Sequence, residues 1–451
     1  MASGGESGQP SAATAGEAAT PRPSVEATPS PSDPPPSTST AIVPGRVNRT
    51  SIDLSATYDA DVTLGFDARK LGVDVAITVK NRSGGDLDRV ELNTIAAPLG
   101  NLRLGPTTVD GVEVEATVKD QTITVPFGGV LPDGATAVLH VRYQARIPTG
   151  LSGSKWMFTR TNGVLQASRW LPWVGLRHPF SRPNDGDPFF TALSPSVKVR
   201  ITTDRKLVIA TPGRRVAVDG LTQTFEAENV RDFHVIASPS FSIRERRVGA
   251  WTIRAYVRRG FPTSTVLDQA ADALRRMSRF AGDYPYPVLT IVQTAGGWGL
   301  EGPGMIWIPD GLSSRWRQWT VYHETAHQWF YGMVGSDGAL DPFADEAAAT
   351  HLGQVVSGIW GTTSCPMRRL DLSIYRYTDR CYFGQIYFRG ANLLERLRHT
   401  MEPGAYWRAI RDYVAAHRFG LGSTRTLLRT LQEHTEHDLR PILAPWFPSL
   451  Y

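Results

Sequence analysis

The chain has 451 residues, of which 41% are apolar and 20% charged, values typical of a soluble globular protein with two or three domains. Its net charge of +5 is mild, and its Lys and Arg residues are scattered rather than gathered in blocks, which argues against nucleic acid as a partner. No apolar run reaches the roughly eighteen residues that a membrane-spanning helix needs.

The N-terminal segment, residues 1–45, is rich in Pro, Ser, Thr, Ala and Gly. Such a composition buries too little surface to offset its ordering entropy, so we predict a disordered tail. The segment lacks the charged and apolar regions of a signal peptide. We expect a missing export signal or lipid anchor, which makes the protein exported or cell-surface bacterial and would be its only link to a membrane. A cytoplasmic location is the alternative.

Residues 46–248 predict an antiparallel β domain. Val73, Val75, Ile77 and Val79 alternate with more polar residues, and a Gly-containing turn follows them. Similar alternation recurs over residues 112–118, 122–125, 137–143 and 197–201. Many short strands separated by Gly and Pro turns favour a sandwich or a saddle.

Residues 249–451 predict a second, mostly α-helical domain that carries the catalytic residues. Its first helix is indicated by apolar residues three and four positions apart: Leu267, Ala270, Ala271, Leu274 and Met277. A strand-like stretch over 288–293 and a Gly-rich segment follow, and then helices continue to the C-terminus. The fold class is therefore α+β and multidomain.

The strongest motif is HETAH over residues 323–327, within a helical run predicted from about Arg315 to Val334. Because residues four apart share a helix face, the imidazoles of His323 and His327 converge on one point, as zinc requires. Glu324 lies off that face and is positioned to act on a water at the metal, as a general base. The run begins with Arg315-Trp316-Arg317, which we interpret as a solvated helix start.

Glu346 is the predicted third ligand of a single Zn²⁺. Its segment also looks helical, because Asp341 can cap it, Pro342 suits a first turn and alanines follow. Two histidines and one carboxylate form the three-ligand set of a catalytic zinc, with one position open. Thr350, one helical turn after Glu346, is expected to hydrogen-bond a ligand imidazole; simple helix packing is the alternative.

Cys365 and Cys381 are the two cysteines of the chain. In an oxidising compartment they could form a disulfide, and closing a loop of this size stabilises a fold by about 3 kcal/mol. Two unrelated thiols are the alternative.

The segment VYHETAHQWF, residues 321–330, with Glu346 at its spacing, resembles the aminopeptidase N and leukotriene hydrolase family of gluzincin zinc metallopeptidases. Further segments resemble family motifs in the family's order: YPYP at 284–287, GLEGPG at 299–304 and YFRGA at 387–391. The chain looks like a short bacterial form that lacks the family's C-terminal helical domain. The resemblance implies a thermolysin-like catalytic domain behind the β domain.

The resemblance also implies roles for individual residues. Glu301 would bind the α-amine of a peptide substrate, and Gly299 would let the backbone approach that substrate closely. Tyr387 would donate a hydrogen bond to the oxyanion of the transition state, with Tyr375, Tyr377 and Tyr382 as nearby competitors. The sequence departs from the family's pattern at Gly302, Asp345 and Ala347, where the family usually has Asn, Asn and Gly.

Together these observations predict a zinc-dependent aminopeptidase that hydrolyses the N-terminal residues of peptides. One alternative is an endopeptidase or dipeptide-releasing peptidase on the same zinc site, because no helical domain covers the cleft. Another is a catalytically silent interaction scaffold. The sequence indicates neither the oligomeric state nor the preferred N-terminal residue.

Overall fold

In a computed structural model of the chain, the structure describes residues 41–178 and 189–451, which belong to one compact unit. Residues 1–40 of the predicted tail lie outside the described residues. No helix in the described ranges is long and apolar enough to cross a membrane.

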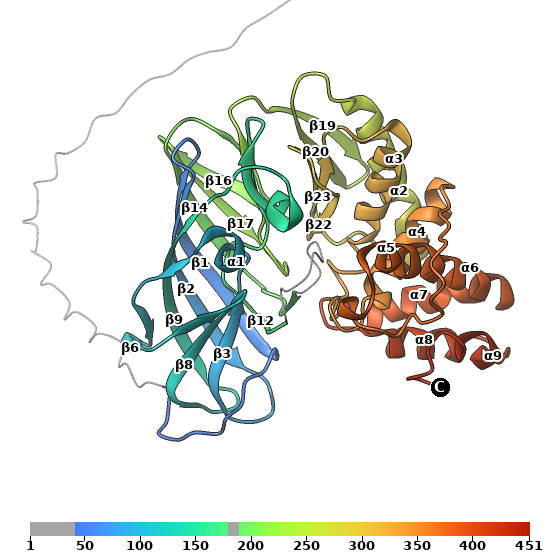
Figure 1. The fold of residues 1–451 in the computed structure, drawn as a ribbon, viewed down its shortest axis with the longest axis horizontal. Helices are drawn as coiled ribbons and strands as arrows, with labels where there is room; N and C mark the ends of the chain where they lie inside the picture. Colours follow the sequence, from blue (N-terminus) through green and yellow to red (C-terminus); the bar gives the residue numbers. More distant parts are fainter. Residues whose placement is uncertain (1–40, 179–188) are drawn as a thin grey trace, which may run out of the picture. The chain divides into compact units, whose positions relative to one another are not determined.

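The N-terminal part of the described chain is built from β-sheets (Figure 1). The largest sheet has, in spatial order, β16 (Arg214–Asp219), β17 (Thr222–Ala227), β14 (Val197–Thr203), β1 (Leu54–Gly65), β2 (Lys70–Asn81), β9 (Thr136–Arg146), β5 (Thr107–Val109) and β6 (Val112–Val114), with β4 (Arg103–Leu104) beside β9. A second sheet contains β13 (Phe190–Thr191), β12 (Trp173–Leu176), β3 (Leu87–Asn93), β8 (Thr122–Leu131) and β7 (Thr117–Lys119). A third contains β10 (Phe158–Thr161), β11 (Val164–Ala167), β18 (Val235–Ser238) and β15 (Val208–Ala210). Two short helices join them, α1 (Ala96–Gly100) and η1 (Gly153–Met157).

Alternating residues of β2 build the core of the largest sheet, as the sequence predicts. Val75, Ile77 and Val79 are fully buried, because every second side chain of a strand points to the same face. The expectation of purely antiparallel sheets is wrong at one place, since β1 pairs with β14 in parallel, Tyr58 facing Val197. More than a hundred residues separate these two strands in the chain, so no hairpin dictates their direction.

The C-terminal part of the chain combines one sheet with helices. The sheet has the order β19 (Ser242–Val248), β20 (Trp251–Val257), β21 (Val288–Thr294), β23 (Met305–Pro309) and β22 (Leu300–Gly302). The longer helices are α2 (Thr263–Ala281), α3 (Ser314–Ala326), α4 (Ala348–Ser357), α6 (Ala391–Thr400), α7 (Ala405–Ala416) and α8 (Thr424–Glu433). Shorter segments are η2 (Phe343–Ala347), η3 (Ile374–Arg376), α5 (Asp379–Tyr382), η4 (Phe383–Gly390) and α9 (Arg440–Leu443).

This architecture agrees with a β domain followed by a mostly helical one, and helix α2 covers the predicted apolar periodicity. β19 and β20 form a hairpin whose turn contains the predicted boundary between residues 248 and 249. The domain boundaries themselves remain predictions.

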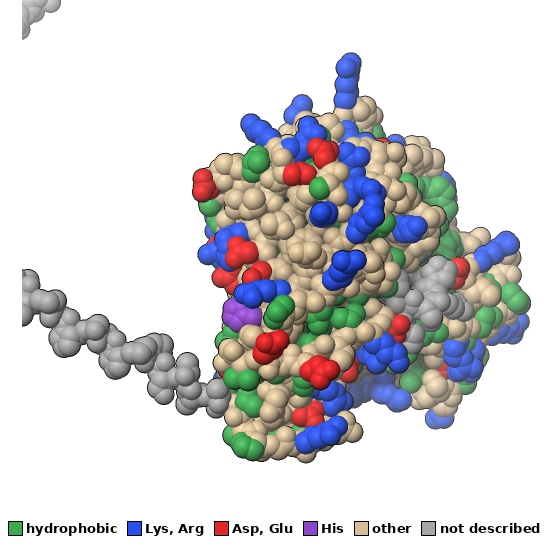
Figure 2. Space-filling view, turned by 60° about the vertical axis from the view of Figure 1, so that its left-hand side comes forward, with side chains coloured by type: hydrophobic (Ala, Val, Ile, Leu, Met, Phe, Trp, Pro, Cys, Tyr) green, Lys and Arg blue, Asp and Glu red, His purple; other side chains and the backbone are tan. Residues whose placement is uncertain are grey.

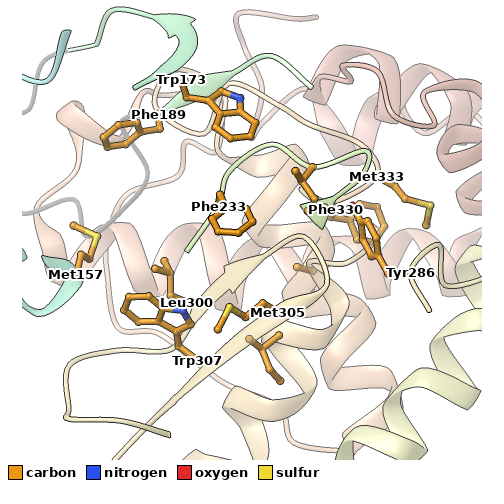
Figure 3. Packing of buried hydrophobic residues seen from close by; sticks show 14 of the residues in the cluster. Met157, Trp173, Phe189, Phe233, Tyr286, Leu300, Met305, Trp307, Phe330 and Met333 are labelled. Carbon is orange, nitrogen blue, oxygen red and sulfur yellow. The ribbon is translucent and has the colours of Figure 1, made fainter. Parts of the chain in front are cut away.

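The hydrophobic core runs without interruption from the β-sheets into the helical part. Figure 3 shows Phe233, from the β part, lying between Trp173 of the same part and Met305 of the C-terminal part, all within one buried cluster. Polar contacts join the two parts as well. The amide of Ala295 donates to Oε1 of Gln166 (2.8 Å), and the hydroxyl of Tyr286 donates to the carbonyl of Asn229 (3.0 Å). The two parts therefore support each other around the site described below.

Two features concern the surface and the cysteines. On the face drawn in Figure 2, Lys and Arg side chains are scattered among Asp and Glu.

Cys365 and Cys381 form a disulfide with their Cα atoms 5.4 Å apart. The bond ties the segment before α5 to α5 itself, and α5 leads directly into η4.

Candidate active site

Helix α3 carries the HETAH motif, but it is shorter than predicted. It begins with Ser313 as its N-cap and ends at Ala326, whereas the sequence predicts a helix to Val334. Beyond His327 the amide of Gly332 bonds back to the carbonyl of His327, and Tyr331 adopts the strained φ of 129°. The chain turns sharply here, and this strain lies directly beside the candidate metal ligands, where such strain is often functional.

Three ligand atoms converge where the sequence predicts a metal. Nε2 of His323 lies 3.1 Å from Nε2 of His327, and Oε2 of Glu346 lies 3.3 Å from each of these nitrogens. Bonds of about 2.0–2.1 Å to a tetrahedral zinc separate neighbouring ligand atoms by about 3.3–3.4 Å. Oε2 of Glu346 is also buried with no hydrogen-bond partner within the described ranges. The spacing and the orphaned oxygen both fit a zinc ion.

The far side of each imidazole is held by another group. Nδ1 of His327 lies 2.8 Å from both Oδ1 of Asp345 and the carbonyl of Phe330. Since both oxygens are acceptors, Nδ1 carries the proton and the Nε2 lone pair is left for a metal. The hydroxyl of Thr350 lies 3.2 Å from Nδ1 of His323, where the sequence analysis expects it. Trp319 stacks flat on the His323 ring, with centroids 4.5 Å apart.

The titration behaviour of His323 and Glu346 suits metal binding. Burial, with His327 nearby, lowers the pKa of His323 to about 4, so this imidazole is neutral at physiological pH. Burial acts to raise the pKa of Glu346, but His327 and His323 outweigh it, and the pKa is lowered. A neutral imidazole and an ionised carboxylate are the forms in which these side chains bind metals. At His327, burial acts to lower the pKa, but Glu346 and Asp345 outweigh it and raise the pKa, so this imidazole loses a proton when a metal binds.

Glu346 and Tyr387 both lie in π-helical segments, η2 and η4, which pack against each other. A Cβ on Gly390 would stand 2.7 Å from Cβ of Ala347, so glycine is needed for this approach. The predicted cap of the Glu346 helix is wrong: Asp341 does not cap η2, which starts after Pro342. The carboxylate of Asp341 instead accepts a hydrogen bond from the amide of Thr424, 2.8 Å away, at the start of α8.

Glu301 lies on β22, the edge strand of its sheet, close to the motif helix. Oxygens of Glu301 and Glu324 and a nitrogen of His327 all lie within 4.8 Å of one another. Nη2 of Arg169, from the β domain, lies 3.1 Å from Oε1 of Glu301, and its Nε lies 3.5 Å from Asp232. Glu301, Arg169 and Asp232 are all buried, so this charge network holds the Glu301 carboxylate in place.

The segment 298–304 runs alongside α3 and is fixed to it. A Cβ on Gly299 would stand 2.2 Å from Oε1 of Glu324 and 2.6 Å from Cγ2 of Thr320. Further along, the side chain of Gln328 donates to the carbonyl of Gly302 (3.0 Å) and accepts the amide of Gly304 (2.8 Å). The side-chain amide of Gln328 thus sets the register between this segment and the motif helix.

These residues face a cavity of about 620 Å³. Tyr387 lines it, with its ring centroid 5.3 Å from that of His323. Among the competing tyrosines, Tyr382 also lines the cavity, whereas the hydroxyl of Tyr377 donates to the carbonyl of Arg369 at 3.0 Å. The cavity lining is Trp298, Gly299, Leu300, Glu301, Leu312, Trp316, Trp319, Thr320, His323, Glu324, Glu346, Asp379, Arg380, Tyr382, Phe383 and Tyr387.

The structure therefore brings together every site residue that the sequence predicts. The sequence alone does not predict Arg169 and Asp232 as supports of Glu301, or Gln328 as the link to its segment. Trp316, which the sequence places in a solvated helix start, is 47% exposed at the start of α3 and also lines the cavity. Trp319 could have been found, because it precedes His323 by one turn and so shares its helix face.

No family model and no curated protein matches the sequence. Solved structures do match. A mutant M1 zinc metallopeptidase from Deinococcus radiodurans, bound to a Tyr-Ser-Ala substrate, has a TM-score of 0.69 at 20% identity, covering 87% of this chain and 94% of its own. A mutant two-domain M1 zinc metallopeptidase bound to L-tryptophan has a TM-score of 0.69 at 21% identity, with 90% and 96% covered. An M1 zinc metallopeptidase from D. radiodurans has a TM-score of 0.67 at 22% identity, with 87% and 93% covered. This chain therefore has the two-domain fold of the M1 zinc metallopeptidases, the fold class that the sequence predicts.

Proposed function

We propose that this chain is a zinc aminopeptidase, with one Zn²⁺ held by His323, His327 and Glu346. The converging ligand atoms and the buried, unpartnered oxygen of Glu346 support the metal. The structural neighbours add support, because they were solved with a peptide substrate and with the free amino acids L-arginine and L-tryptophan. A free amino acid presents the α-amine that an aminopeptidase must recognise.

The observation that carries the exopeptidase proposal is the closed end of the cavity at Glu301. Behind this carboxylate lie three buried side chains that do not line the cavity: Arg169, 3.1 Å from Oε1 of Glu301, then Asp232, 3.5 Å from Arg169, and Tyr331, 3.0 Å from Asp232. A peptide whose amine reaches Glu301 has no room to extend past it. An endopeptidase needs an open path on both sides of the scissile bond, so the closed end favours cleavage after the first residue.

Each of the other site residues has a role in this proposal. Zinc, when bound, supplies a Lewis acid for a carbonyl and lowers the pKa of water. Glu324 takes the proton from the attacking water and passes it to the leaving amine. Tyr387 donates a hydrogen bond to the oxyanion as negative charge develops there. Glu301 pairs with the substrate ammonium, Gly299 leaves room for substrate and base, and Thr350 orients His323.

The test is hydrolysis of free-amine aminoacyl amides beside their N-acetylated counterparts, with a chelated sample as control. We expect cleavage of the free-amine set alone. Glu324→Gln should lower kcat by about 10²–10⁴-fold while zinc stays bound, as metal analysis would show. Glu245→Gln, on an exposed strand, is the matched control. Equal cleavage of acetylated substrates would replace this proposal with an endopeptidase, and no cleavage at all would favour an interaction scaffold.

We further propose that the protein is exported. Support comes from the Cys365–Cys381 disulfide, since disulfides persist in oxidising compartments and are rare in the cytosol. Fractionation of the producing cells, with the free thiols of the protein titrated in each fraction, tests this. Reduced protein found only in the cytosol would overturn it.

A further inference from the structure

The part of the cavity away from Glu301 is walled by aromatic rings. Trp298 stands 6.4 Å from Phe383, and Phe383 stands 6.0 Å from Trp319, measured between ring centroids. Trp319 in turn meets Trp316 edge-on at 5.8 Å. Trp298 comes from the Glu301 segment, Trp316 and Trp319 come from α3, and Phe383 begins η4. The wall is therefore assembled from three separate parts of the catalytic domain around one space.

Two of these rings are unusually open to solvent. Trp298 is 61% exposed and Trp316 is 47% exposed, although both line the cavity. Large exposed apolar side chains beside a cavity commonly mark a binding surface. Tryptophan is well suited to such a role, because it offers a large rigid face whose stacking is favourable beyond simple area burial.

The direction of a bound peptide follows from how the segment 298–304 lies along α3. Glu301 groups with Glu324 and His327, toward the C-terminal end of α3. Gly299 lies beside Glu324 and beside Thr320, which is one helical turn before Glu324 in α3. Trp316 is one further turn before Thr320. From His323 to Trp316 the helix rises about 10 Å, roughly the length of three extended residues. With its amine at Glu301 and its first carbonyl at the metal, a peptide continues toward the aromatic wall.

We propose that Trp298, Trp316, Trp319 and Phe383 form a specificity site for the residue that follows the scissile bond, and that this site selects an aromatic or large apolar side chain. The inference rests on the proposed aminopeptidase function and deepens it by naming a substrate class. Two charged residues of α5, Asp379 and Arg380, also line the cavity, but they are exposed and of opposite sign, so together they favour neither an acidic nor a basic side chain.

The test compares the tripeptides Ala-Phe-Ala, Ala-Ala-Ala and Ala-Glu-Ala, which differ only in the second residue, together with alaninamide, which has none. We expect kcat/KM for Ala-Phe-Ala to exceed that for Ala-Ala-Ala by about tenfold, the value of partly burying one aromatic ring. Trp298→Ala and Trp316→Ala should each reduce this ratio to about threefold or less, whereas Trp298→Phe should preserve most of it.

Trp360→Ala is the matched control, since Trp360 is 38% exposed but does not line the cavity, and it should leave the ratio unchanged. Because both cavity tryptophans are largely exposed, their variants should melt within a few degrees of the parent. A ratio near one in the parent, or a ratio that neither alanine variant changes, overturns this inference. In that case cleavage of alaninamide still supports the proposed aminopeptidase function. Failure to cleave any of the four substrates, alaninamide included, overturns the proposed function and this inference with it.

Discussion

The backbone of Gly299 lies against the carboxylate of Glu324, so that a Cβ on residue 299 would stand 2.2 Å from Oε1. No other residue type fits there unless the Glu324 carboxylate moves. Gly299→Ala should therefore displace the proposed base by about 1 Å and lower kcat by about 100-fold. Steady-state kinetics checks this, with bound zinc measured in parallel. Parental kcat in the variant would show that Glu324 has no fixed position in catalysis.

Arg169 is the buried cation between two buried carboxylates. Arg169→Met should leave Glu301 and Asp232 without it and destabilise the fold by about 3–5 kcal/mol, and KM should rise because Glu301 is no longer held. Urea denaturation measures the first effect. Arg142→Met is the control, because the Arg142–Asp74 pair is about half exposed and should contribute less than about 1 kcal/mol. Equal losses of unfolding free energy in the two variants would contradict a special stabilising role for the buried Arg169 network.

Asp345 holds the proton-bearing side of His327. Asp345→Ala should weaken zinc binding by about 10- to 100-fold, the usual effect of losing a partner behind a metal-binding histidine. Asp345→Asn should be milder, because its amide oxygen can still accept the Nδ1 proton. Competition with a zinc chelator gives both affinities. If the Asn variant binds as weakly as the Ala variant, the charge of Asp345 matters rather than its hydrogen bond.

The Cys365–Cys381 disulfide fixes the segment that leads into η4. Replacing both cysteines by serine should lower the free energy of unfolding by about 3 kcal/mol. It should also raise KM, because the residues on both sides of Cys381 line the cavity: Asp379, Arg380, Tyr382 and Phe383. Denaturation with and without a reductant tests this: the reduced parent should approach the variant, while the variant itself should not respond.

The local geometry of the candidate metal site could be predicted because it depends on short spacings. His323 and His327 share a helix face whatever surrounds the helix, and the disulfide needs only two cysteines within reach. The end of α3 could not be predicted, because residues 327–334 retain a helical pattern of apolar residues. Tertiary contacts such as that between Tyr331 and Asp232, 3.0 Å apart, replace helical hydrogen bonds there.

The support of Glu301 was out of reach for a different reason. Arg169 and Glu301 are 132 positions apart, and nothing in the sequence near either residue points to the other. The same holds for Asp341, whose position before Pro342 is typical of a helix cap. Its actual partner, Thr424, lies 83 positions later, and only the packing of α8 brings the two together.

The π-helical turns at Glu346 and Tyr387 make the site sensitive to chain length in a way that substitutions do not reveal. A π turn holds one residue more than an α turn, so deleting one residue would let each segment relax into a regular helix. Because the extra residue is taken up within the wide turn, the helices on either side would keep their register, while the side chains inside the turn would change direction. In η2 this would turn Glu346 away from the histidines, and in η4 it would turn Tyr387 out of the cavity. Each of the two segments thus departs from regular α-helical hydrogen bonding, and this departure directs one side chain into the site.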